Sequence, residues 1–164
     1  MLLLDERTTL TPADHQTHRR YTFDVPEACD ELEIRLRYAP GLLSPGESAP
    51  LVAAAVSAQR DELARGLGES LAAAWSAEHS SSVNEISIEN LLTISLDDAL
   101  GTYRGAGHRH ADDQRLTLSA YTASPGLIAG PLPAGAWTLT LSAHTVASAQ
   151  CEVSIQIGAV IASS

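Results

Sequence analysis

The stretch ELEIRLRY, residues 31–38, constrains the fold more than any other part of this sequence. Its apolar residues are Leu32, Ile34, Leu36 and Tyr38, and the charged residues between them are Glu31, Glu33, Arg35 and Arg37. Side chains of a β-strand point alternately to opposite faces, so this pattern places one set against a core and the other in water. The stretch therefore predicts a half-buried β-strand.

Similar alternation recurs along the chain and defines the expected fold. It is found in RYTFDV (20–25), VNEISIENLLTISLDD (83–98), RLTLSAYT (115–122), WTLTLSAH (137–144) and CEVSIQIGAVI (151–161). Glycine and proline gather between these stretches, most densely in ASPGLIAGPLPAGA (123–136). Short strands separated by such turns are typical of two-layer antiparallel folds. We expect seven or eight strands in an all-β, antiparallel β-sandwich of the jelly-roll type, with residues 1–164 as a single domain.

One segment has a different composition and predicts a helical insertion at about 47–78. It is rich in Ala, Leu, Glu and Arg, which are strong helix formers. Ser48 is expected to cap the first helix, with Pro50 in its first turn. The GLG of residues 66–68 should end that helix, and residues 71–79 should form a second one. We expect the insertion to cover one side of the β domain.

The expected first helix has an apolar side formed by Val52, Val56, Leu63 and Leu67. An amphipathic helix must bury such a side, either within its own chain or on another subunit. The alanines of the segment permit close helix approach. We therefore predict a homodimer to which the insertion contributes the interface.

The net charge argues against nucleic-acid and membrane partners, and the cysteines show no metal-binding motif. The chain has 20 acidic residues against 10 basic ones and a net charge of -10. We expect neither a nucleic-acid partner nor an anionic membrane surface, because both require a basic face. No segment has the apolar length of a membrane span or the pattern of a secretory signal, so a cytoplasmic protein is expected. Cys29 and Cys151 lie outside any metal-binding motif and are predicted to be free thiols.

The loop GTYRGAGHRHADD, residues 101–113, contains the candidate site residues. His108 and His110 would point to the same face of a strand, which suits zinc, and Asp112 is the nearest further ligand. Asp113, His15 and His18 are other candidates for completing a metal site, although no spacing fixes their distances. A solvated or hydrogen-bonded histidine pair is the preferred interpretation, so no metal or other cofactor is predicted.

The same loop also suggests anion binding. Arg104 and Arg109 flank Gly105 and Gly107, and glycine lets backbone amides turn toward an anion that arginine can grip. Arg104, His108, Arg109 and His110 are therefore the candidate ligand-binding residues. The neighbouring aspartates Asp97, Asp98, Asp112 and Asp113 are equally close in sequence. Internal Arg–Asp pairs that stiffen a strand connection are the favoured alternative.

Four stretches together resemble a known family. They are TFDVP (22–26), SLDDALGTYRG (95–105), the crossing ASPGLIAGPLPAGAW (123–137) and the strand CEVSIQI (151–157). In this order they resemble the N-terminal β-sandwich domain of the CehA/McbA family of PHP-type metallohydrolases. Ala99 and Ile128 stand where that family has proline and tyrosine. The resemblance implies the sandwich fold, and it places the family's catalysis in a following PHP domain.

The sequence ends at Ser164, shortly after the last predicted strand, so we expect no catalytic PHP domain and no catalytic residue in this chain. The leading hypothesis is a non-catalytic accessory or binding module, with a separate metallohydrolase chain as one candidate partner. One alternative is a metal-dependent hydrolase that uses the His-rich loop 104–113. The other is a structural oligomerisation protein whose interface is the helical insertion.

Overall fold

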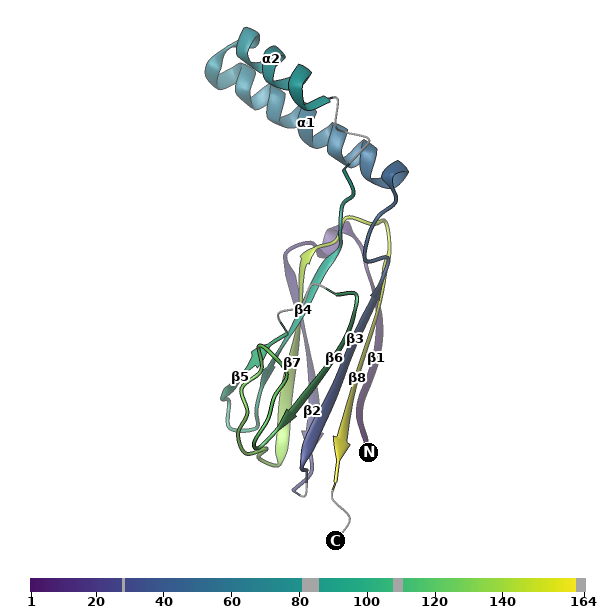
Figure 1. Cartoon of the computed structure of the whole chain (residues 1–164), viewed down its shortest axis with the longest axis vertical. Helices are drawn as coiled ribbons and strands as arrows, with labels where there is room; N and C mark the ends of the chain where they lie inside the picture. The colour runs from purple at the N-terminus through teal and green to yellow at the C-terminus, as the bar shows by residue number, and fades with distance from the viewer. Residues whose placement is uncertain (28, 81–85, 108–110, 162–164) are drawn as a thin grey trace. The chain divides into compact units, whose positions relative to one another are not determined.

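The computed structural model describes residues 1–27, 29–80, 86–107 and 111–161, and within them it has two antiparallel four-stranded sheets (Figure 1). Sheet A has the strand order β1-β8-β3-β6, and sheet B has the order β2-β7-β4-β5. The strands are β1 (Leu2–Leu10), β2 (Thr17–Val25), β3 (Glu31–Ala39), β4 (Leu91–Asp97), β5 (Tyr103–Ala106), β6 (Asp113–Ser119), β7 (Gly135–Thr145) and β8 (Cys151–Val160).

The hydrophobic core lies between the two sheets. The apolar residues of β3 are buried as predicted, and they join one cluster with side chains from every strand except β5. Trp137 on β7 is fully buried and packs near Phe23 on β2, with 6.4 Å between their ring centroids. This arrangement is a β-sandwich, and it leaves the charged alternate residues of sheet A on its outer face.

Two strands of the structure do not follow from the alternation. β1 is an edge strand that pairs with β8, and only Leu4 and Leu10 of its residues are buried. β5 has four residues and lies inside the stretch 101–113 that was predicted as a loop. The reverse error occurs in the predicted stretch 83–98, where Leu91–Asp97 is the one strand among the described residues 86–98. Edge and very short strands have little apolar periodicity, which explains these differences.

The helical insertion forms a compact unit of its own, Leu42–Glu89, distinct from the unit that contains the sheets. It has two helices, α1 (Pro45–Leu67) and α2 (Glu69–Ser80), which contact each other. The first helix ends at the predicted GLG, with Gly68 as its C-cap. None of the helices in the described part of the chain is long and apolar enough to cross a membrane.

The predicted N-cap at Ser48 is wrong, because α1 begins one turn earlier. Ser44 is the N-cap, and its side chain accepts a hydrogen bond from the Glu47 amide at 3.3 Å. The Glu47 carboxylate accepts one in return from the Ser44 amide at 2.9 Å. This reciprocal capping box satisfies two amides of the first turn. Ser48 is instead buried inside the helix, where its hydroxyl accepts a hydrogen bond from the Ile88 amide.

Candidate functional site

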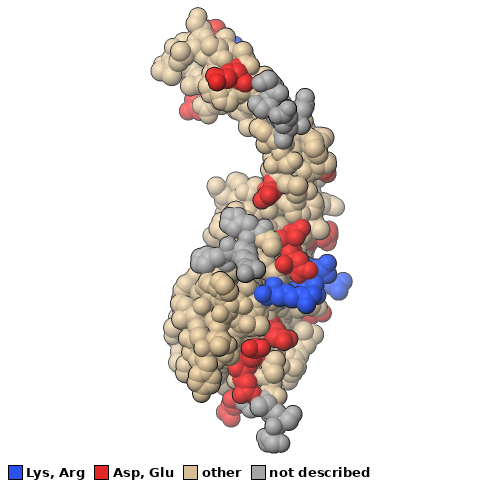
Figure 2. Space-filling view, viewed as in Figure 1, with Lys and Arg blue, Asp and Glu red and all other residues tan. Residues whose placement is uncertain are grey.

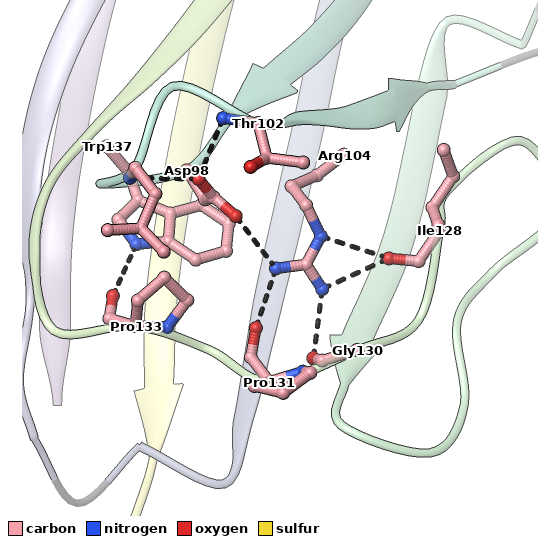
Figure 3. A network of polar contacts seen from close by, with 9 residues as sticks. Asp98, Thr102, Arg104, Ile128, Gly130, Pro131, Pro133 and Trp137 are labelled. Carbon is pink, nitrogen blue, oxygen red and sulfur yellow. Dashed lines mark hydrogen bonds and ion pairs between the residues drawn. The ribbon is translucent and has the colours of Figure 1, made fainter.

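Arg104, the first predicted ligand-binding residue, lies on β5 with 3% of its surface exposed. Its guanidinium donates to the backbone oxygens of Ile128, Gly130 and Pro131 (Figure 3). A longer contact of 3.5 Å reaches the Asp98 carboxylate. These bonds engage all five N–H groups of the side chain. No N–H group remains for an external anion, so Arg104 connects β5 to the Pro/Gly-rich crossing.

Asp98 organises the turn next to this guanidinium. Its Oδ1 atom accepts hydrogen bonds from the Leu100 and Thr102 amides, both at 2.9 Å. Its Oδ2 atom is the one that faces Arg104. Arg104 and Asp98 therefore form an internal Arg–Asp pair, the arrangement that the sequence favoured over anion binding. An aspartate bonded to the amides two and four residues ahead is a turn residue.

The structure says little about the remaining predicted site residues. His108, Arg109 and His110 lie outside the described residues. Asp112 is exposed, and its backbone oxygen accepts a hydrogen bond from the Tyr38 amide. Within the described ranges, no group of three or more His, Cys, Asp or Glu side chains has the geometry to hold a metal ion.

Four arginines lie on the outer face of sheet A; three of them are exposed and Arg35 is half-buried. Arg7, Arg35, Arg37 and Arg115 point outward from β1, β3 and β6, and we call these four residues the arginine stripe. Strand register arranges them in two neighbouring rows across the sheet. One row is Arg7, Ser154, Arg37 and Asp113, and the other is Asp5, Gln156, Arg35 and Arg115. In Figure 2 a blue patch lies over the strands of sheet A, with red groups on both sides of it.

Only part of the stripe is neutralised within the chain. Arg35 donates to both carboxylate oxygens of Asp113, at 3.2 and 2.9 Å, and Arg37 lies 3.4 Å from the same carboxylate. The hydrogen bonds from Arg35 hold the pKa of Asp113 below its ordinary value. Arg7 and Arg115 have no ion-pair partner among the described residues. Among the described residues, Asp113 is the one carboxylate within ion-pair distance of the stripe, and Asp5 lies in the same row as Arg35 and Arg115.

Three open depressions follow one another along this face. The first has a volume of about 410 Å³ and is lined by Arg35, Arg115 and Gln156, with Gly158 and Leu2 among its other residues. The second, of about 370 Å³, shares Arg35 and Gln156 with the first and adds Arg7 and Arg37. The third, of about 310 Å³, continues past Arg37 to Asp112 and Asp113. The stripe thus lines three open depressions, to which Glu33 and Glu152 also contribute.

The two cysteines are not activated nucleophiles. Cys151 is buried, and burial raises the pKa of its thiol to about 11. Burial also raises the pKa of Cys29, which is partly exposed and whose thiol lies 3.5 Å from the Glu31 backbone oxygen. A thiol with a raised pKa stays protonated at neutral pH, and the thiolate is the reactive form. Neither side chain is therefore suited to covalent catalysis.

The arginine stripe was missed in the sequence, although part of its signal is visible there. Arg35 and Arg37 belong to the alternating stretch 31–38, where they were interpreted as a solvated face. Arg7 and Arg115 lie far away in sequence, and only the pairing of β1, β8, β3 and β6 brings them to the same face.

Comparisons with known proteins add no guidance, because no family model and no curated protein matches the chain.

Proposed function

We propose that the protein is a non-catalytic accessory or binding module that contacts its ligand through the arginine stripe. The observation that carries this proposal is the concentration of four arginines on one outer face of a chain with a net charge of -10. Two of the four have no internal ion-pair partner among the described residues. Guanidinium groups are well suited to binding carboxylate and phosphate, because they offer several donors in a planar fork.

The family resemblance and the topology agree with an accessory role. We propose a jelly-roll topology, which the two strand orders, β1-β8-β3-β6 and β2-β7-β4-β5, support. A domain of the CehA/McbA type would then serve as a binding platform, with a metallohydrolase chain as one candidate partner and the cytoplasm as the expected compartment. A sandwich has no inherent chemistry, so its function is argued from the arginine stripe and not from its fold.

A titration with tripolyphosphate, a compact polyanion, tests this proposal. Two-dimensional NMR spectra of the labelled full chain should show shifts of the Arg7, Arg35, Arg37 and Arg115 side-chain N–H signals. Metal analysis of the same sample separates a binding module from the metal-dependent hydrolase, which requires stoichiometric metal. Shifts that avoid sheet A, or a stoichiometric metal accompanied by hydrolysis of ester substrates, would contradict the proposal.

A second candidate function, self-association through the helical insertion, is favoured by the exposed leucines of α1 and α2. Leu51, Leu67 and Leu71 are 41%, 65% and 56% exposed, whereas Val52 and Ala72 are the buried apolar residues of the two helices. Two helices alone enclose little core, and unburied leucines favour association. We propose a second copy of the same alanine-rich hairpin as the partner, which would make the protein a homodimer.

A further inference from the structure

Three large apolar side chains are exposed together where β5 meets the crossing 123–136. They are Leu100, Tyr103 and Ile128, which are 80%, 52% and 53% exposed. All three line one open depression of about 300 Å³, and Pro131 and Pro133 form another part of its wall. A single exposed apolar side chain is ordinary, but several around one depression are typical of a contact site.

Hydrogen bonds fix the backbone that carries these side chains. Leu100 lies in a turn in which the Asp98 carboxylate accepts from the Leu100 amide and the Gly101 amide donates to the Asp98 backbone oxygen, both at 2.9 Å. The Ile128 amide donates to the Arg104 backbone oxygen at 2.9 Å, and the Ile128 oxygen accepts from the Arg104 guanidinium (Figure 3). A partner therefore meets a preformed surface, which lowers the entropy cost of binding.

An acidic side chain lies beside this depression. Asp97 is directly opposite Tyr103 in the pairing of β4 with β5, and it forms no ion pair among the described residues. Directly opposite residues have Cβ atoms about 5 Å apart. Arg104 is the one basic residue among those that line the depression, and its N–H groups are already bonded. The apolar surface thus has a negative edge without an available internal cation.

We propose that this depression binds a segment of a partner protein in which an aliphatic side chain is followed, two residues later, by a lysine or arginine. The aliphatic side chain contacts Leu100, Tyr103 and Ile128, and the basic side chain pairs with Asp97. Alternate residues of an extended segment point the same way and are about 6.6 Å apart, which suits an apolar contact next to a carboxylate. The site belongs to β5 and the crossing, so the inference goes beyond the arginine stripe of the proposed function.

Charge argues against the other possible occupants of the depression. Two copies packed through it would bring two Asp97 carboxylates into one interface and add no unbonded cation. The phosphates of a nucleic acid or of an anionic membrane would meet Asp97 as a like charge, which is unfavourable. A partner segment with a basic residue supplies the opposite charge and leaves the apolar contact intact.

NMR titration of the labelled full chain with the peptide Ser-Leu-Ser-Lys-Ser, blocked at both ends, tests the proposal. Shifts should concentrate at Leu100, Tyr103 and Ile128, and their concentration dependence gives the Kd. Leu100→Ser should weaken binding about tenfold, because the contact area of a leucine side chain is lost. Leu2→Ser is the matched control, since Leu2 is 62% exposed but lies on sheet A, and it should change the affinity less than about twofold.

A double-mutant cycle tests the charge pair. A peptide with glutamine in place of lysine should bind the native chain about threefold more weakly, because an exposed ion pair contributes only modestly. In Asp97→Asn the two peptides should bind equally. Asp24→Asn removes an exposed carboxylate from β2 instead, and it should preserve the threefold preference for lysine.

Several results would overturn the inference. The peptide could fail to bind, Leu2→Ser could weaken binding as much as Leu100→Ser, or the preference for lysine could persist in Asp97→Asn. Tighter binding of a thymidine trinucleotide or of phosphatidylglycerol vesicles would have the same consequence, and so would a change of oligomeric state in Leu100→Ser, which would assign the depression to a second copy. Comparison of the two peptides on the native chain requires no variant to fold. Tripolyphosphate shifts on sheet A test the proposed function separately, so each proposal can fail alone.

Discussion

The guanidinium carbon of Arg104 lies 5.3 Å from the centroid of the Trp137 ring, so a buried cation stacks on the largest side chain of the core. The indole N–H of Trp137 in turn donates to the Pro133 backbone oxygen at 2.8 Å. Both side chains thereby hold the crossing 123–136, which has three prolines and contains no strand before β7 begins at Gly135. Cation–π contacts are strongest when water is excluded, as it is here.

Arg104→Met should therefore destabilise the sandwich strongly, by about 3–5 kcal/mol. The substitution leaves the buried Asp98 carboxylate without its cation and leaves three backbone oxygens of the crossing without a donor. Chemical denaturation followed by tryptophan fluorescence measures the change. Arg20→Met, at an exposed position on β2, is the control and should change stability by less than about 0.5 kcal/mol. Equal effects of the two substitutions would show that the buried network contributes nothing.

Gly105→Ala should destabilise the fold by about 2 kcal/mol or more, since two penalties act together. Gly105 has a φ of +100°, and a Cβ atom there would lie 2.2 Å from the Gly126 oxygen. Gly158→Ala is the control within the same unit, because the corresponding Cβ meets nothing closer than 3.6 Å. Thermal unfolding midpoints of the two variants should differ clearly. If they coincide, β5 does not approach the crossing as closely as these distances require.

Asn90→Ala should cost about 3 kcal/mol, because Asn90 is buried and all of its side-chain polar atoms are bonded. Its amide nitrogen donates to the Pro40 oxygen and the Ser148 hydroxyl, both at 2.8 Å, and its side-chain oxygen accepts from the amides of Ala147 and Ser148. Ser148→Ala removes only one of these partners and should cost about 1 kcal/mol. Urea denaturation compares the two variants, and the reverse order of their effects would contradict this account.

Stability should fall in acid partly through Asp113. Its pKa is below the ordinary value of 3.8 in the folded protein, because Arg35 bonds its carboxylate. A lowered folded-state pKa contributes stability above the unfolded-state pKa, and that contribution disappears as the pH falls through the folded-state value. Arg35→Gln removes the bond, so the gap in stability between the native protein and this variant should narrow on going from about pH 7 to about pH 2.

Carbon-detected NMR titration gives the pKa of Asp113 directly. The pKa of Asp113 should rise toward the ordinary value in Arg35→Gln. It should remain low in Arg20→Gln, which also removes one arginine charge but from sheet B. A stability gap that stays constant with pH, together with an unchanged pKa, would show that Arg35 and Asp113 do not pair in solution.

Removal of the helical unit tests the proposed homodimer. The Asn90 amide donates to the Gly41 oxygen at 2.8 Å, so the two ends of the sandwich chain are adjacent, and a short Gly/Ser linker can replace Leu42–Glu89. The shortened protein should be a folded monomer, whereas the full chain should be a dimer by light scattering. A full chain that is monomeric at high concentration contradicts self-association. A shortened chain that is still dimeric places the interface on the sandwich instead.

The sequence by itself determined the local features of this protein. Alternation in residues 31–38 predicted which side chains of β3 are buried, and the GLG at 66–68 predicted the end of α1, because both signals depend on neighbours along the chain. The prediction that α1 starts at Ser48 is wrong, because Ser44 and Ser48 are both followed by a proline within two residues and both fit the pattern of an N-cap. Ser44 is the N-cap because Glu47 completes its capping box. Local chemistry explains both the success and the error.

Tertiary structure alone decided where the charges lie. The loop 101–113 concentrates arginine and histidine in sequence, yet Arg104 from it is buried and bonded to backbone oxygens that lie 24 to 27 residues away. The arginine stripe draws its members from three strands, and strand pairing across β8 unites Arg7 with Arg37. Strand order and register depend on the packing of the whole core, so no local pattern specifies them. The candidate binding surface is therefore a product of the fold, whereas the strands that compose it are largely a product of the sequence.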